Sequence, residues 1–184
     1  MKNAQFSQEA LVLSHMGFYV RDLNLMSNFY QDVLDFTVTD QGDLGSMQIV
    51  FLSRDPTEHH QIILASGRPE DLGFGLINQI SFKVPDLNFL RIFHQKAKEH
   101  ALVTDLVSIT HGNAVSIYFR DPELNRIEIF MDSPWYCEQP LRVEIDLQQS
   151  DEEILKIVKD LAMSRPNFSS RQDWLEKTKS KMGY

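Results

Sequence analysis

The chain has 184 residues and a mass of 21.3 kDa, and 42% of its residues are hydrophobic and 24% charged, as in an ordinary globular domain. Its formal net charge is −8, and no run of basic residues offers a surface for nucleic acid or for an anionic membrane. No apolar stretch is long enough to span a membrane, and the opening MKNAQFSQEA lacks the layout of a signal peptide. We therefore expect a cytoplasmic protein whose partners are small molecules.

An internal repeat organises most of the chain. Residues 13–32 and 77–96 align at an offset of 64, with identical residues at seven positions. The tripeptide Arg-Asp-Pro also recurs, at 54–56 and 120–122. Because both matches follow nearly the same offset, the sequence predicts two related structural copies.

Each copy predicts the same order of elements, β-α-β-β-β. A short apolar segment (11–20, then 77–84) precedes an aspartate in a helix N-cap position, Asp22 or Asp86. Apolar residues then recur at helical spacing: Leu25, Met26, Phe29, Tyr30, Val33 and Leu34, and in the second copy Leu87, Leu90, Phe93 and Ala97. The predicted strands that follow are about 35–40, 46–53 and 59–66, then about 103–110, 113–120 and 125–131. The glycine-rich residues 67–76 are the expected linker.

Beyond the repeat, the sequence predicts two further helices. Residues 151–163 carry apolar residues at helical spacing, and Ser170 with Asp173 is typical of a cap that opens a second helix. We expect an apolar face to pack on a module or on a neighbouring subunit; it includes Ile154, Val158, Leu161 and Trp174. Pairing of exposed strands or of these helices favours a homodimer.

Four polar side chains fall at positions of the predicted strands that are expected to be apolar: His15, Gln79, Glu128 and His60. His15 and Gln79 are related by the repeat, and Glu128 and His60 lie in the last strand of their copies. Burying an uncompensated charge or imidazole costs on the order of several kcal/mol, and one metal ion would compensate all four. Any one of these residues alone is more often a hydrogen-bonded polar residue. Their matching positions favour a shared metal site.

Two further residues are candidates for substrate binding. His111 lies where a predicted strand gives way to a glycine turn, and Tyr118 lies on the next strand. Taken separately, His111 is more typical of a residue in a surface turn, and Tyr118 of an aromatic residue packed in the core.

The two modules, with metal-type side chains on their first and last strands, and the stretch THGNAVSIYFRDPELNRIEIFMDSPWY (110–136) resemble the vicinal oxygen chelate superfamily. Within it, THG, IYFRDP and NRIE are most similar to the single-domain type I extradiol dioxygenases. The resemblance covers about residues 11–146. It implies an α+β fold in which two tandem modules, about 11–66 and 77–132, form one vicinal oxygen chelate domain (1–146), followed by a C-terminal helical extension (147–184).

The resemblance also implies a site and a reaction. In those dioxygenases, two histidines and one glutamate hold Fe(II), and the enzyme cleaves a catecholic ring with O2. Carried over by motif, the metal ligands are His15, Gln79 and Glu128, and the catalytic residues are His60, His111 and Tyr118. In this assignment His60 transfers a proton, and the other two catalytic residues hydrogen-bond the bound catecholate.

Two residues depart from the family pattern. Gln79 replaces a histidine ligand, and because an amide oxygen suits harder ions than imidazole does, Mn, Zn or Ni are alternatives to Fe(II). Glutamine is a ligand in the glyoxalase and epimerase branches, so with His60 as a fourth ligand the chain resembles a non-oxidative isomerase, epimerase or lyase. A metal-free binding protein of the bleomycin-resistance type is the third alternative. Leu124 stands where the turn motif usually has glycine.

Overall fold

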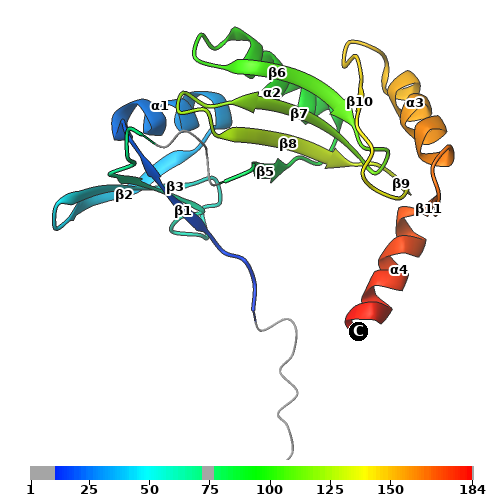
Figure 1. Cartoon of the computed structure of the whole chain (residues 1–184), viewed down its shortest axis with the longest axis horizontal. Coiled ribbons are helices and arrows are strands. Elements are labelled where there is room, and N and C mark those ends of the chain that lie inside the picture. The colour runs from blue at the N-terminus through cyan, green and yellow to red at the C-terminus, as the bar shows by residue number, and fades with distance from the viewer. Residues whose placement is uncertain (1–10, 72–76, 184) are drawn as a thin grey trace, which may run out of the picture. The chain divides into compact units, whose positions relative to one another are not determined.

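The structure, a computed structural model, describes residues 11–71 and 77–183, and the chain divides into two compact units, residues 1–72 and 73–184 (Figure 1). The first unit contains β1 (Met16–Val20), α1 (Leu23–Leu34), β2 (Thr37–Leu44), β3 (Met47–Ser53) and β4 (Ile62–Ser66). The second begins with β5 (Ile80–Lys83), α2 (Leu87–Glu99), β6 (Thr104–Thr110), β7 (Ala114–Arg120) and β8 (Arg126–Asp132). It continues with β9 (Trp135–Tyr136), β10 (Val143–Glu144), α3 (Asp151–Met163), β11 (Ser169–Ser170) and α4 (Arg171–Met182). The predicted β-α-β-β-β order is thus confirmed in both copies.

The sheet of the first unit has the order β1-β4-β3-β2, with β1 parallel to β4 and the other pairs antiparallel. Helix α1 packs on this sheet through its predicted apolar face, of which Phe29, Tyr30 and Val33 are almost completely buried. Leu25 is the exception, because it stays 36% exposed in the first turn of the helix.

The sheet of the second unit has the order β10-β6-β7-β8-β5 and repeats the same pattern. Its first strand, β5, runs parallel to its last long strand, β8, and the other long strands pair antiparallel. The four predicted apolar residues of α2 are all buried: Leu87, Leu90, Phe93 and Ala97. The repeat in sequence therefore corresponds to a repeat in sheet topology.

Both helices begin where the sequence predicts. The side chain of Asp22 accepts a hydrogen bond from the backbone N–H of Leu25 (2.9 Å), and that of Asp86 accepts one from Phe89 (3.0 Å). Each aspartate thereby satisfies a backbone donor that the first helical turn leaves unpaired.

The two Arg-Asp-Pro turns differ in burial. Asp121, in the second unit, is fully buried and accepts bonds from the backbone N–H groups of Glu123 and Asn125 and from the Asn125 side chain. Burial raises the pKa of Asp121 to about 6, against the lowering effect of these bonds. Leu124 in the same turn adopts a left-handed conformation with φ of 66°, which explains why glycine is usual there.

The structure corrects the strand boundaries that the sequence predicts. β1 begins only at Met16, β4 at Ile62 and β5 at Ile80, so His15, His60 and Gln79 precede their strands and strand alternation does not decide where they point. The register also corrects the pairing of His60 with Glu128. Ser81 lies opposite Glu128, and its repeat counterpart Gly17 lies opposite Ile63, so Ile63 takes the place of Glu128 in the first unit.

The C-terminal helices, orange and red in Figure 1, confirm the prediction for the tail. Ile154 and Val158 are completely buried and Leu161 is half-buried, while the Trp174 ring stacks on Tyr136 with centroids 5.4 Å apart. Ser170 caps α4 by accepting a bond from the backbone of Asp173 (3.0 Å). The tail therefore packs on the second unit.

Residues 67–71 form neither helix nor strand, and the remainder of the predicted linker, 72–76, lies outside the described residues. No helix within 11–71 or 77–183 is both long and apolar enough to cross a membrane.

Candidate active site

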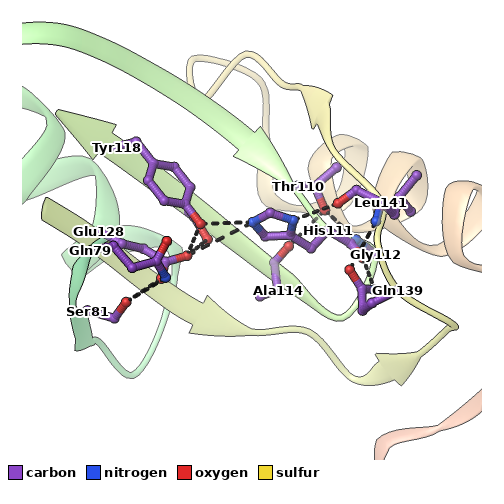
Figure 2. A network of polar contacts seen from close by, with 11 residues as sticks. Gln79, Ser81, Thr110, His111, Gly112, Ala114, Tyr118, Glu128, Gln139 and Leu141 are labelled. Atoms are coloured by element: carbon purple, nitrogen blue, oxygen red, sulfur yellow. Dashed lines mark hydrogen bonds and ion pairs between the residues drawn. The ribbon is translucent and has the colours of Figure 1, made fainter. Parts of the chain in front are cut away.

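Glu128 on β8 is the centre of a polar network in the second unit (Figure 2). It is only 7% exposed. Its Oε2 accepts hydrogen bonds from Gln79 Nε2 (3.0 Å) and Ser81 Oγ (2.6 Å). Its Oε1 accepts bonds from Ser116 Oγ (2.9 Å) and the Tyr118 hydroxyl (2.5 Å). Four donors thus compensate the charge of a carboxylate that is withdrawn from water.

Sheet register places these donors. β8 lies between β5 and β7, and the register sets Ser81 and Tyr118 directly opposite Glu128 on the two neighbouring strands. Ser116 lies two residues before Tyr118 and therefore on the same face of β7. Gln79 reaches the carboxylate from the segment just before β5.

His111 extends the network beyond the tyrosine, as Figure 2 shows. Its Nδ1 lies 2.6 Å from the carbonyl oxygen of Leu141, and because a carbonyl only accepts, Nδ1 carries a proton and donates. Its Nε2 lies 3.0 Å from the Tyr118 hydroxyl and 4.0 Å from Glu128 Oε1. The tyrosine therefore bridges an imidazole and a carboxylate.

The protonation of this bridge follows from its surroundings. Burial, followed by the bond to Glu128 and the charge of that carboxylate, raises the pKa of the Tyr118 hydroxyl above its usual 10. The phenol is therefore protonated at neutral pH, and its proton is directed to Glu128. His111 Nε2 can donate to the tyrosine oxygen when the imidazole is protonated, which makes a continuous path for a proton.

A glycine turn holds His111 in place. Gly112 has a φ of 75°, and a Cβ atom at this position would lie 2.6 Å from Cys137 Sγ, so only glycine fits. The backbone carbonyl of His111 accepts a bond from Gln139 Nε2 (2.8 Å), and its N–H donates to Ala114 (2.9 Å). The β6–β7 turn thus fixes both the backbone and the ring of His111.

The first unit brings the other two predicted residues together. The rings of His15 and His60 lie with centroids 4.3 Å apart, and His60 Nδ1 lies 2.8 Å from His59 Nδ1. Burial first, and then the neighbouring imidazoles, lower the pKa of His60 below its usual 6.5. His60 is therefore neutral at pH 7, which suits both a proton acceptor and a metal ligand.

The predicted site residues thus form two groups. Gln79, Glu128, Tyr118 and His111 meet in the second unit, and His15 and His60 meet in the first. That both groups share one metal stays a prediction. Within the described residues, no three His, Cys, Asp or Glu side chains form a group able to hold a metal ion. The predicted ligand set differs from such a group because it includes a glutamine and draws on both units.

The residues of the second unit fit a divalent metal. Adjacent ligands on an ion with bonds of about 2.1 Å are separated by about 3 Å, and Gln79 Nε2 lies 3.0 Å from Glu128 Oε2. A turn of the amide by half a revolution would present its oxygen, the atom that binds a metal, in place of this nitrogen. A carboxylate and an amide oxygen are hard ligands, suited to ions such as Mn2+ and less suited to soft ones.

A cavity of about 540 Å3 borders this network in the second unit. Gln79, His111 and Tyr118 line it, together with three arginines: Arg120, Arg126 and Arg142. A larger cavity of about 800 Å3, between α2, β6 and residues 144–151, contains none of the predicted site residues. The smaller cavity is therefore the candidate substrate site.

Three polar partners in these networks are absent from the sequence prediction: Ser81, Ser116 and His59. For Ser116 a signal exists, because it precedes Tyr118 by two residues and shares its strand face. For Ser81 the signal is its spacing of two residues from Gln79 in the predicted strand, although Gln79 precedes β5 in the structure. The hydrogen bond between His59 and His60 has no comparable signal, since both lie in the irregular segment before β4.

Two β-α-β-β-β modules, with a buried glutamate on the last long strand of the second, are the features of the superfamily that the sequence resembles. Comparison with known families confirms this superfamily. The family model described as "Glyoxalase/Bleomycin resistance protein/Dioxygenase superfamily" matches residues 12–129. The chain belongs to this superfamily. A search of curated proteins finds no match.

Solved structures show the same fold. A glyoxylase/bleomycin resistance protein/dioxygenase domain from Frankia sp. EAN1pec is 21% identical, with a TM-score of 0.56, covering 65% of this chain and 90% of that one. The fosfomycin resistance protein FosX from Mesorhizobium loti is 26% identical, with a TM-score of 0.50 and coverage of 64% and 89%. A mutant FosX from Listeria monocytogenes, complexed with Mn(II) and 1S,2S-dihydroxypropylphosphonic acid, is 19% identical, with a TM-score of 0.52 and coverage of 64% and 90%.

Proposed function

We propose that this protein is a divalent-metal-dependent enzyme that binds its substrate through two neighbouring oxygen atoms, and that it cleaves a catecholic ring with O2 in the extradiol manner. The observation that carries the proposal is the Tyr118 hydroxyl, which bridges the His111 imidazole and the Glu128 carboxylate beside a cavity. This arrangement supports the proposal because it brings a hydroxyl group together with the carboxylate that we propose as a metal ligand.

The proposed ligands are His15, Gln79 and Glu128. A bound divalent ion would lower the pKa of both substrate hydroxyls and hold the substrate ready for reaction with O2. Membership of the superfamily and the 3.0 Å separation of Gln79 and Glu128 support a metal site. Fe(II) is the ion that the proposed reaction uses. Mn is an alternative, because the amide oxygen of Gln79 suits harder ions than imidazole does.

Tyr118 and His111 have the chemistry needed to stabilise negative charge on a substrate oxygen. The Tyr118 phenol keeps its proton because burial and Glu128 raise its pKa. That single proton is donated to Glu128, and a rotation of the hydroxyl away from the carboxylate would direct it to a substrate oxyanion in the cavity. His111 Nε2, 3.0 Å from the tyrosine oxygen, supports that oxygen from the other side.

His60 has the chemistry of a general base. Its neutral imidazole can accept a proton from a substrate hydroxyl, because burial and the imidazoles of His15 and His59 lower its pKa. The bond between His59 and His60, 2.8 Å long, would let the accepted proton be shared with a second ring.

A second candidate function is a non-oxidative reaction on a vicinal-dioxygen substrate, such as that of an isomerase or lyase. The observation that favours it is the close approach of His15 and His60, whose rings lie 4.3 Å apart. If both rings bound the metal, four protein ligands would leave only two open positions on a six-coordinate ion, too few for a bidentate substrate and O2 together.

Oxygen uptake by Fe(II)-loaded protein with a panel of catechols tests the proposal. We expect uptake that depends on both the metal and the catechol, and that Glu128→Ala abolishes. The matched control is Glu144→Ala, which removes an exposed carboxylate of the same unit and should leave uptake unchanged. Metal-loaded protein that binds catechols without consuming O2 would contradict ring cleavage and favour the non-oxidative alternative.

A further inference from the structure

The cavity beside Tyr118 has a strongly cationic wall. Arg120, Arg126 and Arg142 line it, and Asp105 is its only acidic lining residue among those the structure describes. The chain as a whole carries a formal charge of −8, so this positively charged surface has the opposite sign to the net charge of the protein. A local reversal of sign in a cavity is the arrangement that attracts an oppositely charged ligand.

Sheet register places two of these arginines on the site. Arg120 and Arg126 lie directly opposite each other on β7 and β8, and Tyr118 and Glu128 form the next pair on the same face. Like charges at directly opposite positions of antiparallel strands destabilise a sheet. The stability of the sheet therefore does not explain why two arginines, Arg120 and Arg126, occupy these opposite positions.

The three arginines differ in how far their charge is compensated. Arg120 donates to Asp105 Oδ2 (2.8 Å) and to the carbonyl oxygen of Leu124 (2.8 Å). The side chains of Arg126 and Arg142 are exposed and make no hydrogen bond or ion pair with any residue that the structure describes. Two guanidinium groups beside the cavity are thus available to a ligand.

Both available arginines lie close to the candidate catalytic groups. Arg126 is two residues before Glu128, and its charge acts on the Tyr118 hydroxyl, where it opposes the rise in pKa. Arg142 directly follows Leu141, whose carbonyl oxygen accepts the Nδ1 proton of His111. A ligand that hydrogen-bonds Tyr118 therefore lies within the reach of these two long side chains.

We propose that Arg126 and Arg142 bind a carboxylate of the substrate. The substrate would then be a catechol, an aromatic ring with two neighbouring hydroxyl groups, that also carries a carboxylate side chain. The guanidinium fork matches a carboxylate with two parallel hydrogen bonds. Arg126 lies two residues along the strand from Glu128, or about 7 Å, comparable to the span of a substituted benzene ring. The inference deepens the proposed function and rests on it.

Calorimetric titration of Mn(II)-loaded protein without O2 tests this inference. The probes are 3,4-dihydroxyphenylacetate and its methyl ester, which present the same diol with and without the negative charge. We expect the acid to bind about tenfold more tightly than the ester, and Arg126→Gln and Arg142→Gln each to remove most of that preference. Lys177→Gln is the matched control, because it removes one positive charge from an exposed site on α4 and should keep the preference.

Equal affinity for acid and ester, an unchanged preference in both arginine variants, or no binding of the acid at millimolar concentration would overturn the inference. Failure of the proposed function gives a different result. In that case the affinity of the neutral ester would not depend on Mn(II), whereas the preference for the acid and its loss in the arginine variants would remain. Thermal unfolding of each variant shows whether the fold is kept.

Discussion

The Tyr118 hydroxyl donates a 2.5 Å hydrogen bond to Oε1 of Glu128, its direct neighbour across β7 and β8. This bond joins a residue expected to bind the substrate to a residue expected to bind the metal. His111 Nε2 contacts the same hydroxyl, so a charge that develops on one of the three groups interacts electrostatically with the other two.

Removing this hydroxyl is expected to impair turnover without emptying the metal site. Tyr118→Phe should lower kcat by about 10²–10³-fold, the usual effect of losing one donor to a developing oxyanion. Metal content should stay at the wild-type value. Tyr136→Phe is the matched control, since Tyr136 stacks on Trp174 away from Glu128, and it should leave kcat unchanged. Unchanged turnover in Tyr118→Phe would remove the tyrosine from the mechanism.

His60 is expected to act as a base and not as a metal ligand. His60→Ala should leave the metal content near that of the wild type and lower turnover by about 10²–10⁴-fold, as for a lost proton-transfer group. Measurement of metal content beside turnover separates the two roles. Loss of the metal in this variant would make His60 a ligand and favour the non-oxidative alternative.

The pH dependence of kcat/KM should report the same residue. Burial and the neighbouring imidazoles lower the pKa of His60 below 6.5, and the neutral form is the base. Activity should therefore be constant near pH 7 and fall only as the pH drops through a value below 6.5. His60→Ala should lose this acidic limb. An acidic limb centred above 6.5 would contradict the assignment.

The two Arg-Asp-Pro turns should respond to pH in opposite directions. Burial raises the pKa of Asp121 to about 6 from 3.8. The protonated carboxyl therefore contributes stability at low pH, and this contribution, about 3 kcal/mol, is lost as the pH rises through 6. Hydrogen bonds from Thr57 lower the pKa of Asp55, which is only half-buried, so its contribution is present at neutral pH and lost as the pH falls below 3.8. Urea unfolding of Asp121→Asn and Asp55→Asn between pH 3 and 7 measures both. Equal pH profiles for the two variants would contradict the difference in burial.

Leu124 is expected to be replaced favourably by glycine. Its φ of 66° costs a side-chain-bearing residue about 1–2 kcal/mol, and its side chain is 63% exposed, so little burial is lost. After the added flexibility of the unfolded chain is deducted, Leu124→Gly should stabilise the protein by about 0.5–1 kcal/mol. Leu124→Ala keeps the left-handed strain and should bring no gain. Chemical denaturation at pH 7 compares the two.

The features that depend on neighbouring residues could be predicted from the sequence. Asp22 and Asp86 cap their helices as expected, and the apolar faces of both helices are buried, because capping and helical spacing act within one or two turns. Helix α3 spans residues 151–163, as its spacing predicts.

Features that depend on pairing between distant segments were predicted less well. The late starts of β1, β4 and β5 remove His15, His60 and Gln79 from the strands, and the register makes Ile63, not His60, the counterpart of Glu128. Strand ends and register follow from contacts between strands, which a single sequence pattern does not encode. The meeting of Gln79, Tyr118 and His111 around Glu128 was nevertheless implied by the family motifs.

The central claim is that His15, Gln79 and Glu128 hold one divalent metal. Its most direct test is the metal content of protein loaded with Fe(II) without O2 and then desalted, measured for the wild type, His15→Ala, Glu128→Ala and the control His100→Ala. The account predicts one ion per chain in the wild type and in the control, and almost none in the other two variants. A His15→Ala protein that folds and keeps its full metal content would contradict it.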